Sequence, residues 1–307
     1  MKAVRVHGFG DVATLRIESV PAPEPSAEEV LVRVRAAGVN PYDWMTREGN
    51  GAAVTFPWTP GWDLSGTVEA VGREVTAYGP GDEVFAMLAD ERGAYAESVA
   101  VPAANLVPKP ASLSHARAAA VPMVSLTAWQ ALFDHGALQP DQRVLVHAAA
   151  GGVGHVAVQF AGWIGARVAG TASGANREYL TRLGVDEVVN YETERFEAVV
   201  DPVDLVIDAV GGDTLERSLD VLQPGGRIAK LPGPLTTAES RAIEAHGSTG
   251  AYPVVQWKPE QLRTIGRLVA DGTVDVHVER VLPLDDVREA HELSESRHVR
   301  GKIVLEP

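Results

Sequence analysis

The chain has no cysteine among its 307 residues. Disulfides, thiolate nucleophiles and cysteine-ligated metal sites are therefore excluded, because each of them needs a thiol. The sequence also lacks the roughly 20 consecutive apolar residues of a membrane-spanning helix, and its first residues lack the apolar core of a signal peptide. We therefore expect a cytoplasmic protein that does not associate with a membrane.

Positive charge is also scarce, with 27 Lys and Arg residues against 41 Asp and Glu residues and a formal net charge of −14. A protein of this sign repels nucleic acid and anionic lipid, so neither is an expected partner. The nine histidines show neither His-x-x-His nor His-Glu-x-x-His spacing. The sequence thus predicts no metal site.

The length of the sequence and the change in its residue pattern along the chain predict two domains, because a single hydrophobic core stops growing at about 250 to 300 residues. Residues 1 to about 110 contain short valine-rich runs between prolines and glycines, such as 28–39 and 64–72. Such runs are typical of an irregular, mostly-β domain. From Ser114, a candidate N-cap, a helix-like stretch at 114–133 leads into the next domain.

The middle third of the chain alternates strand-like and helix-like segments. The strand-like segments are 143–148, 167–172, 187–191, 203–210 and 226–231. Stretches able to form crossover helices lie between them, most clearly at 152–165, 176–183 and 213–222. This alternation predicts an α/β domain with a doubly wound parallel sheet.

The stretch VHAAAGGVG, residues 146–154, places glycines between a strand-like and a helix-like segment. A dinucleotide-binding turn needs glycine where the backbone approaches a pyrophosphate and where the helix packs closely on the strand. Gly151 and Gly154 take the second and third positions of that motif, and Ala149 replaces the first. A tight turn without a ligand is the alternative, but the helical spacing of the apolar residues that follow favours a nucleotide site.

The end of the next strand-like segment, GTASGANR at 170–177, bears on the choice of cofactor. NAD-binding folds usually place an acid there, but no carboxylate occupies this strand tip, so nothing repels the 2′-phosphate of NADPH. Ser173 can donate a hydrogen bond to that phosphate and Arg177 a charge-assisted one. We therefore expect NADPH as cofactor. The alternative is that Arg177 is an ordinary solvated residue in the first turn of the next helix.

Eight phrases come in a recognisable order along the whole chain: AAGVNPYDWMTREG, PGWDLSGTVEAVG, GDEVFA, LTAWQAL, LVHAAAGGVGHVAVQFA, LGVDEVVNYE, DAVGG and RGKIVLEP. In this order they resemble the medium-chain dehydrogenases/reductases, and among these the zinc-free quinone oxidoreductases related to zeta-crystallin. The resemblance implies a GroES-like catalytic domain formed by residues 1–115 and 256–307, with a Rossmann domain inserted at 116–255. It also implies a cleft that takes NADPH and, by analogy, a homodimer.

The resemblance also bears on the metal. Zinc alcohol dehydrogenases carry Cys at the position of Asn40 and His at the position of Trp62, and they have a cysteine-rich loop that this sequence lacks. A catalytic zinc needs three protein ligands, and neither an amide nor an indole replaces a thiolate or an imidazole. The resemblance therefore implies a zinc-independent enzyme.

Without a Lewis acid, a simple ketone is hard to reduce, because the developing alkoxide lacks a counter-charge. A quinone or an α,β-unsaturated carbonyl spreads the charge over a conjugated system that hydrogen bonds can stabilise. We therefore expect an oxidoreductase that transfers hydride from NADPH to one of these small molecules. Two alternatives stay open: an enoyl or enone reductase dedicated to one biosynthetic intermediate, and an NADPH-binding protein with little turnover.

Two catalytic candidates lie in the phrase that carries the replaced zinc ligand. The amide of Asn40 can donate to a substrate carbonyl or to the nicotinamide ribose. Tyr42 stands where zinc enzymes carry the Ser or Thr of a proton relay, and it can donate a hydrogen bond or a proton. The alternatives are a turn residue before proline for Asn40 and a wall of the cleft for Tyr42. Asp43 is expected to be structural, accepting from backbone amides at the turn.

The glycine motif, the strand end and the resemblance together define a set of expected cofactor-binding residues. They are Asn40, Thr127, Ala150, Gly151, Gly152, Val153, Ser173, Arg177, Tyr191, Val210, Gly211 and Leu231. The resemblance implies that Thr127 lies near the nicotinamide and Tyr191 near the adenosine 2′-phosphate. An ordinary helix hydroxyl is the alternative for Thr127.

Overall fold

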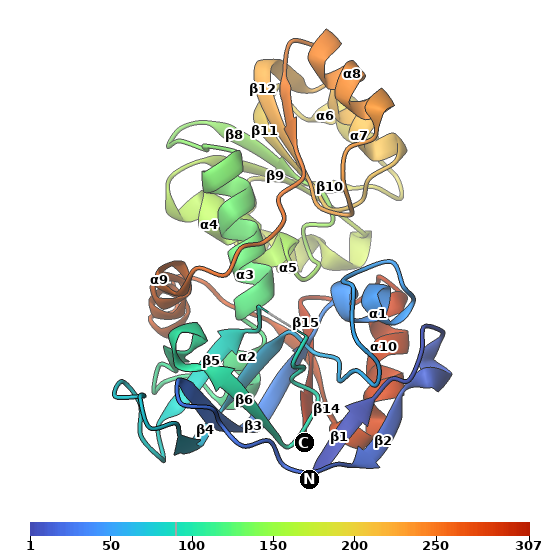
Figure 1. Cartoon of the computed structure of the whole chain (residues 1–307). Helices are drawn as coiled ribbons and strands as arrows, with labels where there is room; N and C mark the ends of the chain where they lie inside the picture. The colour runs from blue at the N-terminus through green and yellow to red at the C-terminus, as the bar shows by residue number, and fades with distance from the viewer. Residues whose placement is uncertain (90) are drawn as a thin grey trace. The chain divides into compact units, whose positions relative to one another are not determined.

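The computed structural model describes residues 1–89 and 91–307 and divides into two compact units. Unit 1 comprises Met1–Met123, Trp257–Gly272 and Val276–Pro307, and unit 2 comprises Val124–Gln256 and Thr273–Asp275. Figure 1 labels most of the helices and strands of both units. Within the described ranges, no helix is both long and apolar enough to cross a bilayer.

The core of unit 2 is a parallel sheet of six strands in the order β10-β9-β8-β11-β12-β13. The strands are β8 (Arg143–Val146), β9 (Arg167–Ala172), β10 (Glu187–Asn190), β11 (Val203–Asp208), β12 (Leu222–Lys230) and β13 (Thr249–Ala251). Numbered along the chain, the order is 3-2-1-4-5-6, which is that of a Rossmann fold. The order reverses between β8 and β11, where open α/β sheets bind their ligands.

The helices of unit 2 precede β8 or connect these strands. They are α3 (Pro122–Trp129), which begins at the junction of the units, α4 (Gly154–Trp163), α5 (Arg177–Arg182), α6 (Phe196–Val199), α7 (Asp213–Ser218) and α8 (Thr237–Ala245). The expected crossover helices are confirmed as α4, α5 and α7, and the expected strands as β8 to β12. The sequence patterns did not predict α6, α8 or β13, because these elements are short or polar and carry little apolar periodicity.

The stretch expected to be helical from Ser114 to residue 133 is interrupted. It forms α2 (His115–Ala119), then α3, and then a π-helical turn at Gln130–His135. Pro122 begins α3 because proline lacks the amide hydrogen that a continuous helix would need and disfavours helical backbone in the residue before it. Ser114 is confirmed as an N-cap, since its hydroxyl accepts from the Arg117 N–H at 3.2 Å.

Unit 1 joins both ends of the chain in one mostly antiparallel sheet, in the order β14-β15-β3-β4-β5-β7, with β6 paired to β3. The strands are β3 (Glu29–Val39), β4 (Asp63–Val71), β5 (Glu83–Met87), β6 (Ser98–Pro102), β7 (Val107–Pro108), β14 (Val278–Pro283) and β15 (Lys302–Glu306). β15 pairs with the N-terminal β3, so the C-terminal segment completes the GroES-like fold. A separate ladder joins β1 (Lys2–Arg5) to β2 (Arg16–Ser19).

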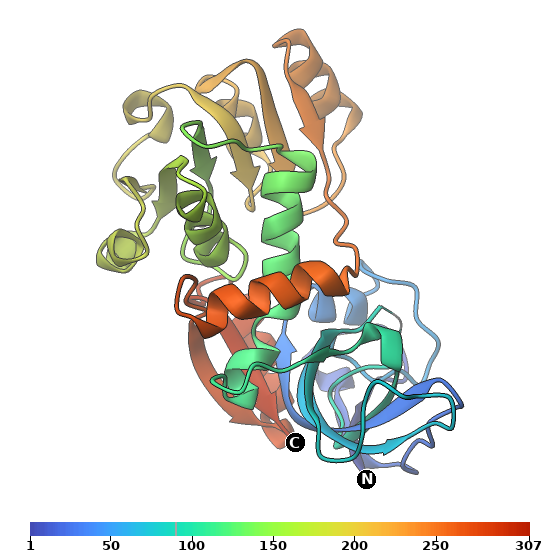
Figure 2. The ribbon, with the colours of Figure 1, turned by 90° about the vertical axis from the view of Figure 1, so that its left-hand side faces the viewer.

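The described part of unit 1 contains the helices α1 (Pro41–Arg47), α2, α9 (Pro259–Ala270) and α10 (Val287–Glu295). α9, the long orange helix of Figure 2, comes close to β5, since a Cβ on Gly266 would lie 3.1 Å from Phe85 Cζ. Because α2 packs on β3 and β4, unit 1 continues past residue 115 to Met123. Thr273–Asp275 falls in unit 2, where both ends of the Gln159 side-chain amide bond the Asp275 backbone.

Candidate functional site

In unit 2, the expected cofactor-binding residues follow the carboxyl ends of five neighbouring strands. Ala150, Gly151, Gly152 and Val153 follow β8, Ser173 and Arg177 follow β9, Tyr191 follows β10, Val210 and Gly211 follow β11, and Leu231 follows β12. Because the carboxyl ends of parallel strands meet at one edge of a sheet, these residues share that edge. Thr127 follows none of these strands and is half-buried on α3.

The turn between β8 and α4 has the close packing that a dinucleotide-binding motif requires. A Cβ on Gly154 would lie 2.3 Å from the Ala148 carbonyl oxygen and 2.7 Å from Ala149 Cα, so only glycine fits there. Ala148 itself adopts a φ of +50°, in the left-handed region. The N-terminus of the ten-residue α4 follows directly, and its partial positive charge suits a pyrophosphate. The residues present therefore fit a dinucleotide.

His147 supports this turn from inside the protein. The Ser218 hydroxyl donates its one hydrogen to the Thr214 carbonyl oxygen at 2.6 Å, so it must accept from His147 Nε2–H, 3.0 Å away. Nδ1 is then unprotonated and accepts from the Thr171 hydroxyl at 3.0 Å. Burial lowers the pKa of His147 to about 3. His147 is thus a neutral packing residue.

Asp208, at the end of β11, fixes two of the loops that carry expected cofactor-binding residues. Its Oδ1 accepts from the N–H groups of Val210 at 2.9 Å and Gly211 at 2.8 Å, and its carbonyl oxygen accepts from the Leu231 N–H at 2.8 Å. Burial raises the pKa of Asp208, while the bonds from Gly211 and Val210 oppose that rise. The sequence analysis missed Asp208, although an acid that ends an apolar strand just before Gly211 is a readable signal.

The tip of β9 differs from the expectation that no carboxylate lies there. The loop after β10 brings two acids to it: Glu194 Oε2 lies 2.9 Å from Arg177 Nη2, and Glu192 Oε2 accepts from the Gly174 N–H at 3.0 Å. The expectation was wrong because it considered one strand, whereas β10 pairs directly with β9. The signal was available in NYETE, which begins at residue 190.

Two of the residues expected at the 2′-phosphate lie at this same tip. Ser173 precedes the 3-10 turn at Gly174–Asn176, and its hydroxyl oxygen accepts from Asn176 Nδ2 at 3.1 Å. Tyr191 follows β10 and is 56% exposed. Both residues therefore follow the carboxyl ends of the paired strands β9 and β10, close in sequence to the start of α5 for Ser173 and to Glu192 for Tyr191.

In unit 1, Asn40 and Tyr42 lie at the start of α1. Asn40 is the N-cap, and its N–H donates to Asp43 Oδ2 at 2.6 Å, which confirms the expected structural role of Asp43. Tyr42 is 37% exposed, and its ring centroid lies 5.5 Å from that of Trp62. The Tyr42 ring is thus positioned by an aromatic neighbour that stands at a former zinc-ligand position.

The Asn40 side chain is held inside a buried network of charges. Its Nδ2 donates to Asp63 Oδ2 at 2.9 Å, and its Oδ1 accepts from Lys302 Nζ at 2.5 Å. The Lys302 ammonium also donates to the Val39 carbonyl oxygen at 2.6 Å and lies 3.7 Å from Asp63 Oδ2. Asn40 is 1% exposed, so its amide is not presented to a substrate or a ribose. This corrects the expectation of direct contact and assigns Asn40 a positioning role.

The protonation of this network depends strongly on burial. Burial raises the pKa of Asp43 to about 7, although hydrogen bonds from the Asn40 N–H and the Tyr95 hydroxyl oppose the rise. Burial also raises the pKa of Asp63 and lowers that of Lys302, and the attraction between the two opposes both shifts. The Tyr95 hydroxyl donates to Asp43 Oδ2 at 2.7 Å. Asp63, Tyr95 and Lys302 were missed because they lie far from residue 40 in sequence.

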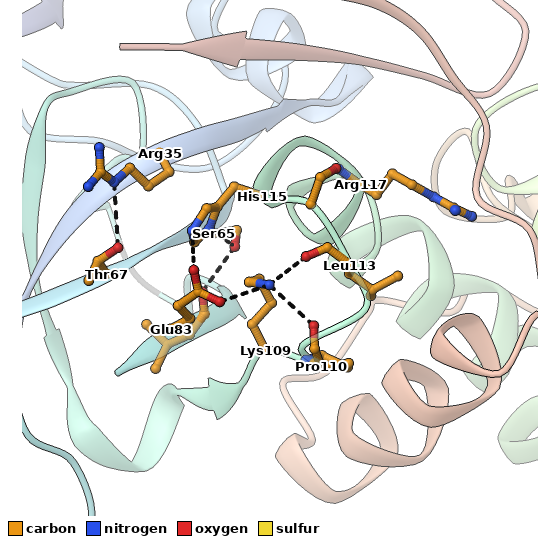
Figure 3. Close-up of polar contacts among 11 residues, drawn as sticks. Arg35, Ser65, Thr67, Glu83, Lys109, Pro110, Leu113, His115 and Arg117 are labelled. Atoms are coloured by element: carbon orange, nitrogen blue, oxygen red, sulfur yellow. Dashed lines mark hydrogen bonds and ion pairs between the residues drawn. The ribbon is translucent and has the colours of Figure 1, made fainter. Parts of the chain in front are cut away.

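A second polar cluster of unit 1, drawn in Figure 3, lies outside the expected site. His115 Nδ1 lies 2.8 Å from Ser65 Oγ, and His115 Nε2 lies 3.1 Å from Glu83 Oε1, an arrangement that resembles a catalytic triad. Ser65 is fully buried, however, and its hydroxyl donates to the Val84 carbonyl oxygen at 3.1 Å. No substrate reaches that oxygen, so the cluster is structural. Lys109 completes it, 3.0 Å from Glu83 Oε2.

A hollow of about 690 Å³ lies beside this cluster, with Arg33, Arg35 and His115 in its lining. None of the expected site residues lines it. Across residues 1–89 and 91–307, no group of three or more His, Asp and Glu side chains is arranged to hold a metal ion.

Known proteins are similar to this chain in sequence and in fold. Residues 26–111 match the alcohol dehydrogenase GroES-like domain, and residues 183–305 match the zinc-binding dehydrogenase family. A chloroplast envelope quinone oxidoreductase homolog of Arabidopsis thaliana is 32% identical, over 100% of this chain and 98% of its own. An NADPH-dependent alkenal/one oxidoreductase of the same plant is 31% identical, over 100% of this chain and 80% of its own. The crystal structure of Escherichia coli quinone oxidoreductase complexed with NADPH is 30% identical, with a TM-score of 0.93 and full coverage of both chains.

The fold, the glycine turn and these relatives define a medium-chain dehydrogenase/reductase. Within that superfamily, the chain belongs to the zinc-independent quinone oxidoreductase family.

Proposed function

We propose that the protein is an NADPH-dependent, zinc-independent reductase of quinones or α,β-unsaturated carbonyls. The observation that carries the proposal is the glycine turn of Gly154 at the sheet edge where the strand order reverses. The same chain has Asn40 and Trp62 where zinc relatives have ligands. The names of its relatives, quinone oxidoreductase and alkenal/one oxidoreductase, support both classes of acceptor.

Bound NADPH supplies the hydride, and the chain's own residues bind and orient the dinucleotide. We propose that the turn Ala150–Val153 and the N-terminus of α4 hold the pyrophosphate. Ser173, Arg177 and Tyr191 are the proposed contacts of the 2′-phosphate. Thr127, Val210, Gly211 and Leu231 are the proposed contacts at the nicotinamide end, where Asp208 fixes the loop of Gly211 through its N–H.

On the substrate side, Tyr42 is the proposed proton donor. Its ring is partly exposed and packs against Trp62, so the phenol is held on the first turn of α1. Asn40 acts as a positioning residue, because its bonds to Asp63 and Lys302 fix the start of the same helix. Hydride transfer leaves one negative charge spread over the conjugated acceptor, and a hydrogen-bond donor can stabilise that delocalised anion before it is protonated.

The test follows the absorbance of NADPH with a panel of benzoquinones, naphthoquinones and short enones. The proposal expects oxidation that depends on the acceptor and persists after exhaustive chelation of divalent metals. Tight NADPH binding without oxidation by any acceptor would contradict it and would favour a binding protein with little turnover. Activity that disappears on chelation and returns with zinc would contradict the zinc-independent mechanism.

We also propose that the protein is a homodimer that acts in the cytoplasm. The support is the analogy with the family. Sedimentation equilibrium tests the oligomeric state, and a mass of 32.6 kDa, that of one chain, would refute the dimer.

A further inference from the structure

The two loops at the tips of β9 and β10 are joined by a carboxylate. Glu192, which is exposed, places its Oε2 3.0 Å from the backbone nitrogen of Gly174 and accepts its hydrogen bond. Little room is left beside Gly174, because a Cβ there would lie 2.9 Å from Asn190 Nδ2 and 3.7 Å from the same Glu192 oxygen. The carboxylate therefore occupies the position of an anion bound to this backbone amide.

The guanidinium at the same tip already has an acidic partner. Arg177 Nη2 donates to Glu194 Oε2 at 2.9 Å, and this oxygen also accepts from the Asn190 N–H at 2.9 Å. Arg177, Glu192 and Glu194 together thus carry one positive charge and two negative charges before any nucleotide arrives. To bind the Gly174 N–H and the Arg177 guanidinium, an incoming phosphate must displace Glu192 and Glu194 from these groups or share the groups with them.

The two nicotinamide cofactors differ at this point only by the group on the adenosine ribose. The 2′-phosphate of NADPH accepts hydrogen bonds and is repelled by a carboxylate, whereas the 2′-hydroxyl of NADH donates to one. A carboxylate at a strand tip is thus the group by which NAD-binding folds recognise the ribose. Glu192 supplies such a group from the neighbouring strand.

We infer that Glu192 is a specificity-determining residue that narrows the preference for NADPH over NADH. It holds the Gly174 N–H in the free protein, yields it to the 2′-phosphate of NADPH, and accepts from the 2′-hydroxyl of NADH. This inference rests on the proposed function, because it assumes that the adenosine ribose lies at the tip of β9. It assigns to Glu192 a role opposite to that of Arg177.

The test measures the dissociation constants of NADPH and NADH by calorimetric titration of the intact protein, without any acceptor. Glu192→Gln keeps the size of the side chain and removes its charge. It should raise the ratio of the dissociation constant of NADH to that of NADPH about tenfold. NADPH should bind more tightly and NADH more weakly. The ratio of kcat/KM values with a quinone acceptor should move in the same direction.

Two further variants separate this local effect from a general change of charge. Glu178→Gln removes an exposed acid from the first turn of α5, next to Arg177, and should change the ratio by less than about twofold. Glu194→Gln releases Arg177 but leaves the Glu192 carboxylate in place, so it should tighten NADPH without weakening NADH.

Equal shifts of the ratio in Glu192→Gln and Glu178→Gln would overturn the inference, as would a change in both constants by the same factor. These results would leave the proposed function intact, because NADPH would still bind. Failure of NADPH to bind the unaltered protein would overturn the proposed function itself, and this inference with it.

Discussion

Replacing Asp43 by Asn should remove much of the pH dependence of stability that this buried carboxyl creates. Burial raises the pKa of Asp43 from 3.8 to about 7. Because the folded pKa lies above the unfolded one, the folded protein binds more protons between about pH 4 and pH 7. The stability that Asp43 contributes is therefore fully present below pH 3.8 and is lost as the pH rises through 7.

The size of the effect follows from the two values. At about 1.4 kcal/mol per pH unit, the interval from 3.8 to 7 corresponds to roughly 4 kcal/mol in the free energy of unfolding. Of this, roughly 2.5 kcal/mol falls between pH 5 and pH 8. The side chain of Asp43→Asn does not titrate, so this part of the fall in the free energy of unfolding from pH 5 to pH 8 should be absent in the variant.

The variant also has a cost that does not depend on pH. The amide oxygen can keep the bonds from the Asn40 N–H and the Tyr95 hydroxyl, but the amide nitrogen then takes the place of Oδ1. That atom is buried and has no hydrogen-bond partner among the described residues, so the nitrogen is left unsatisfied at a cost of about 1 to 3 kcal/mol. The absolute stability of the variant is therefore not the test.

Urea unfolding at pH 5 and pH 8 measures the difference that matters. Asp285→Asn, at a side chain that is 58% exposed, is the control for the substitution itself and should keep the decline of the unaltered protein. If the free energy of unfolding of Asp43→Asn fell between the two pH values as much as that of the unaltered protein, the reasoning about Asp43 would be refuted.

Three further substitutions test other parts of the structure. Lys302→Met should lower the free energy of unfolding by about 3 to 5 kcal/mol at pH 8, because it leaves the Asp63 carboxylate buried without its cation. The loss should be smaller at pH 5, because protonation of Asp63 removes the unpaired charge. An equal loss at both pH values in urea unfolding would contradict this. Tyr42→Phe should lower kcat by about tenfold or more and leave the NADPH dissociation constant unchanged if the phenol donates a proton, and unaltered kinetics would make it a wall residue. Gly154→Ala should weaken NADPH binding and destabilise the protein by about 1 to 3 kcal/mol, because its Cβ would meet the Ala148 carbonyl oxygen at 2.3 Å, and thermal unfolding and titration together would show it.

The parts of the fold that the sequence predicted well are those with local signals. β9 was predicted at its observed bounds, Arg167–Ala172, because an apolar run between polar residues and turn signals needs no distant partner to define it. The glycine turn before α4 was predicted for the same reason, since its spacing lies within nine residues. The break at Pro122 was also readable locally, although the apolar periodicity on both sides of it suggested a continuous helix.

The features that were missed arise where distant segments meet. Asn40 and Lys302 are 262 residues apart in sequence, and only the pairing of β15 with β3 brings the ammonium to the amide. Glu192 and Gly174 are 18 residues apart, and they meet because β10 lies beside β9. In both cases the sequence pattern indicates which residue types are present but not which strands will lie side by side. The prediction therefore missed some of the charges at the site.

The buried ammonium gives a physical reason why this family member should reduce conjugated acceptors. Lys302 is 2% exposed, and its hydrogen bonds and charge are taken up by Asn40, Val39 and Asp63. A cation neutralised in this way cannot also stabilise the full charge of an alkoxide on a substrate, because the nearby Asp63 carboxylate already offsets its positive charge. The Lys302 ammonium therefore holds α1 in place, and we expect the reaction to rely on hydrogen bonds to a delocalised anion. An enolate or a hydroquinone anion meets that condition, whereas the localised alkoxide of a simple ketone does not.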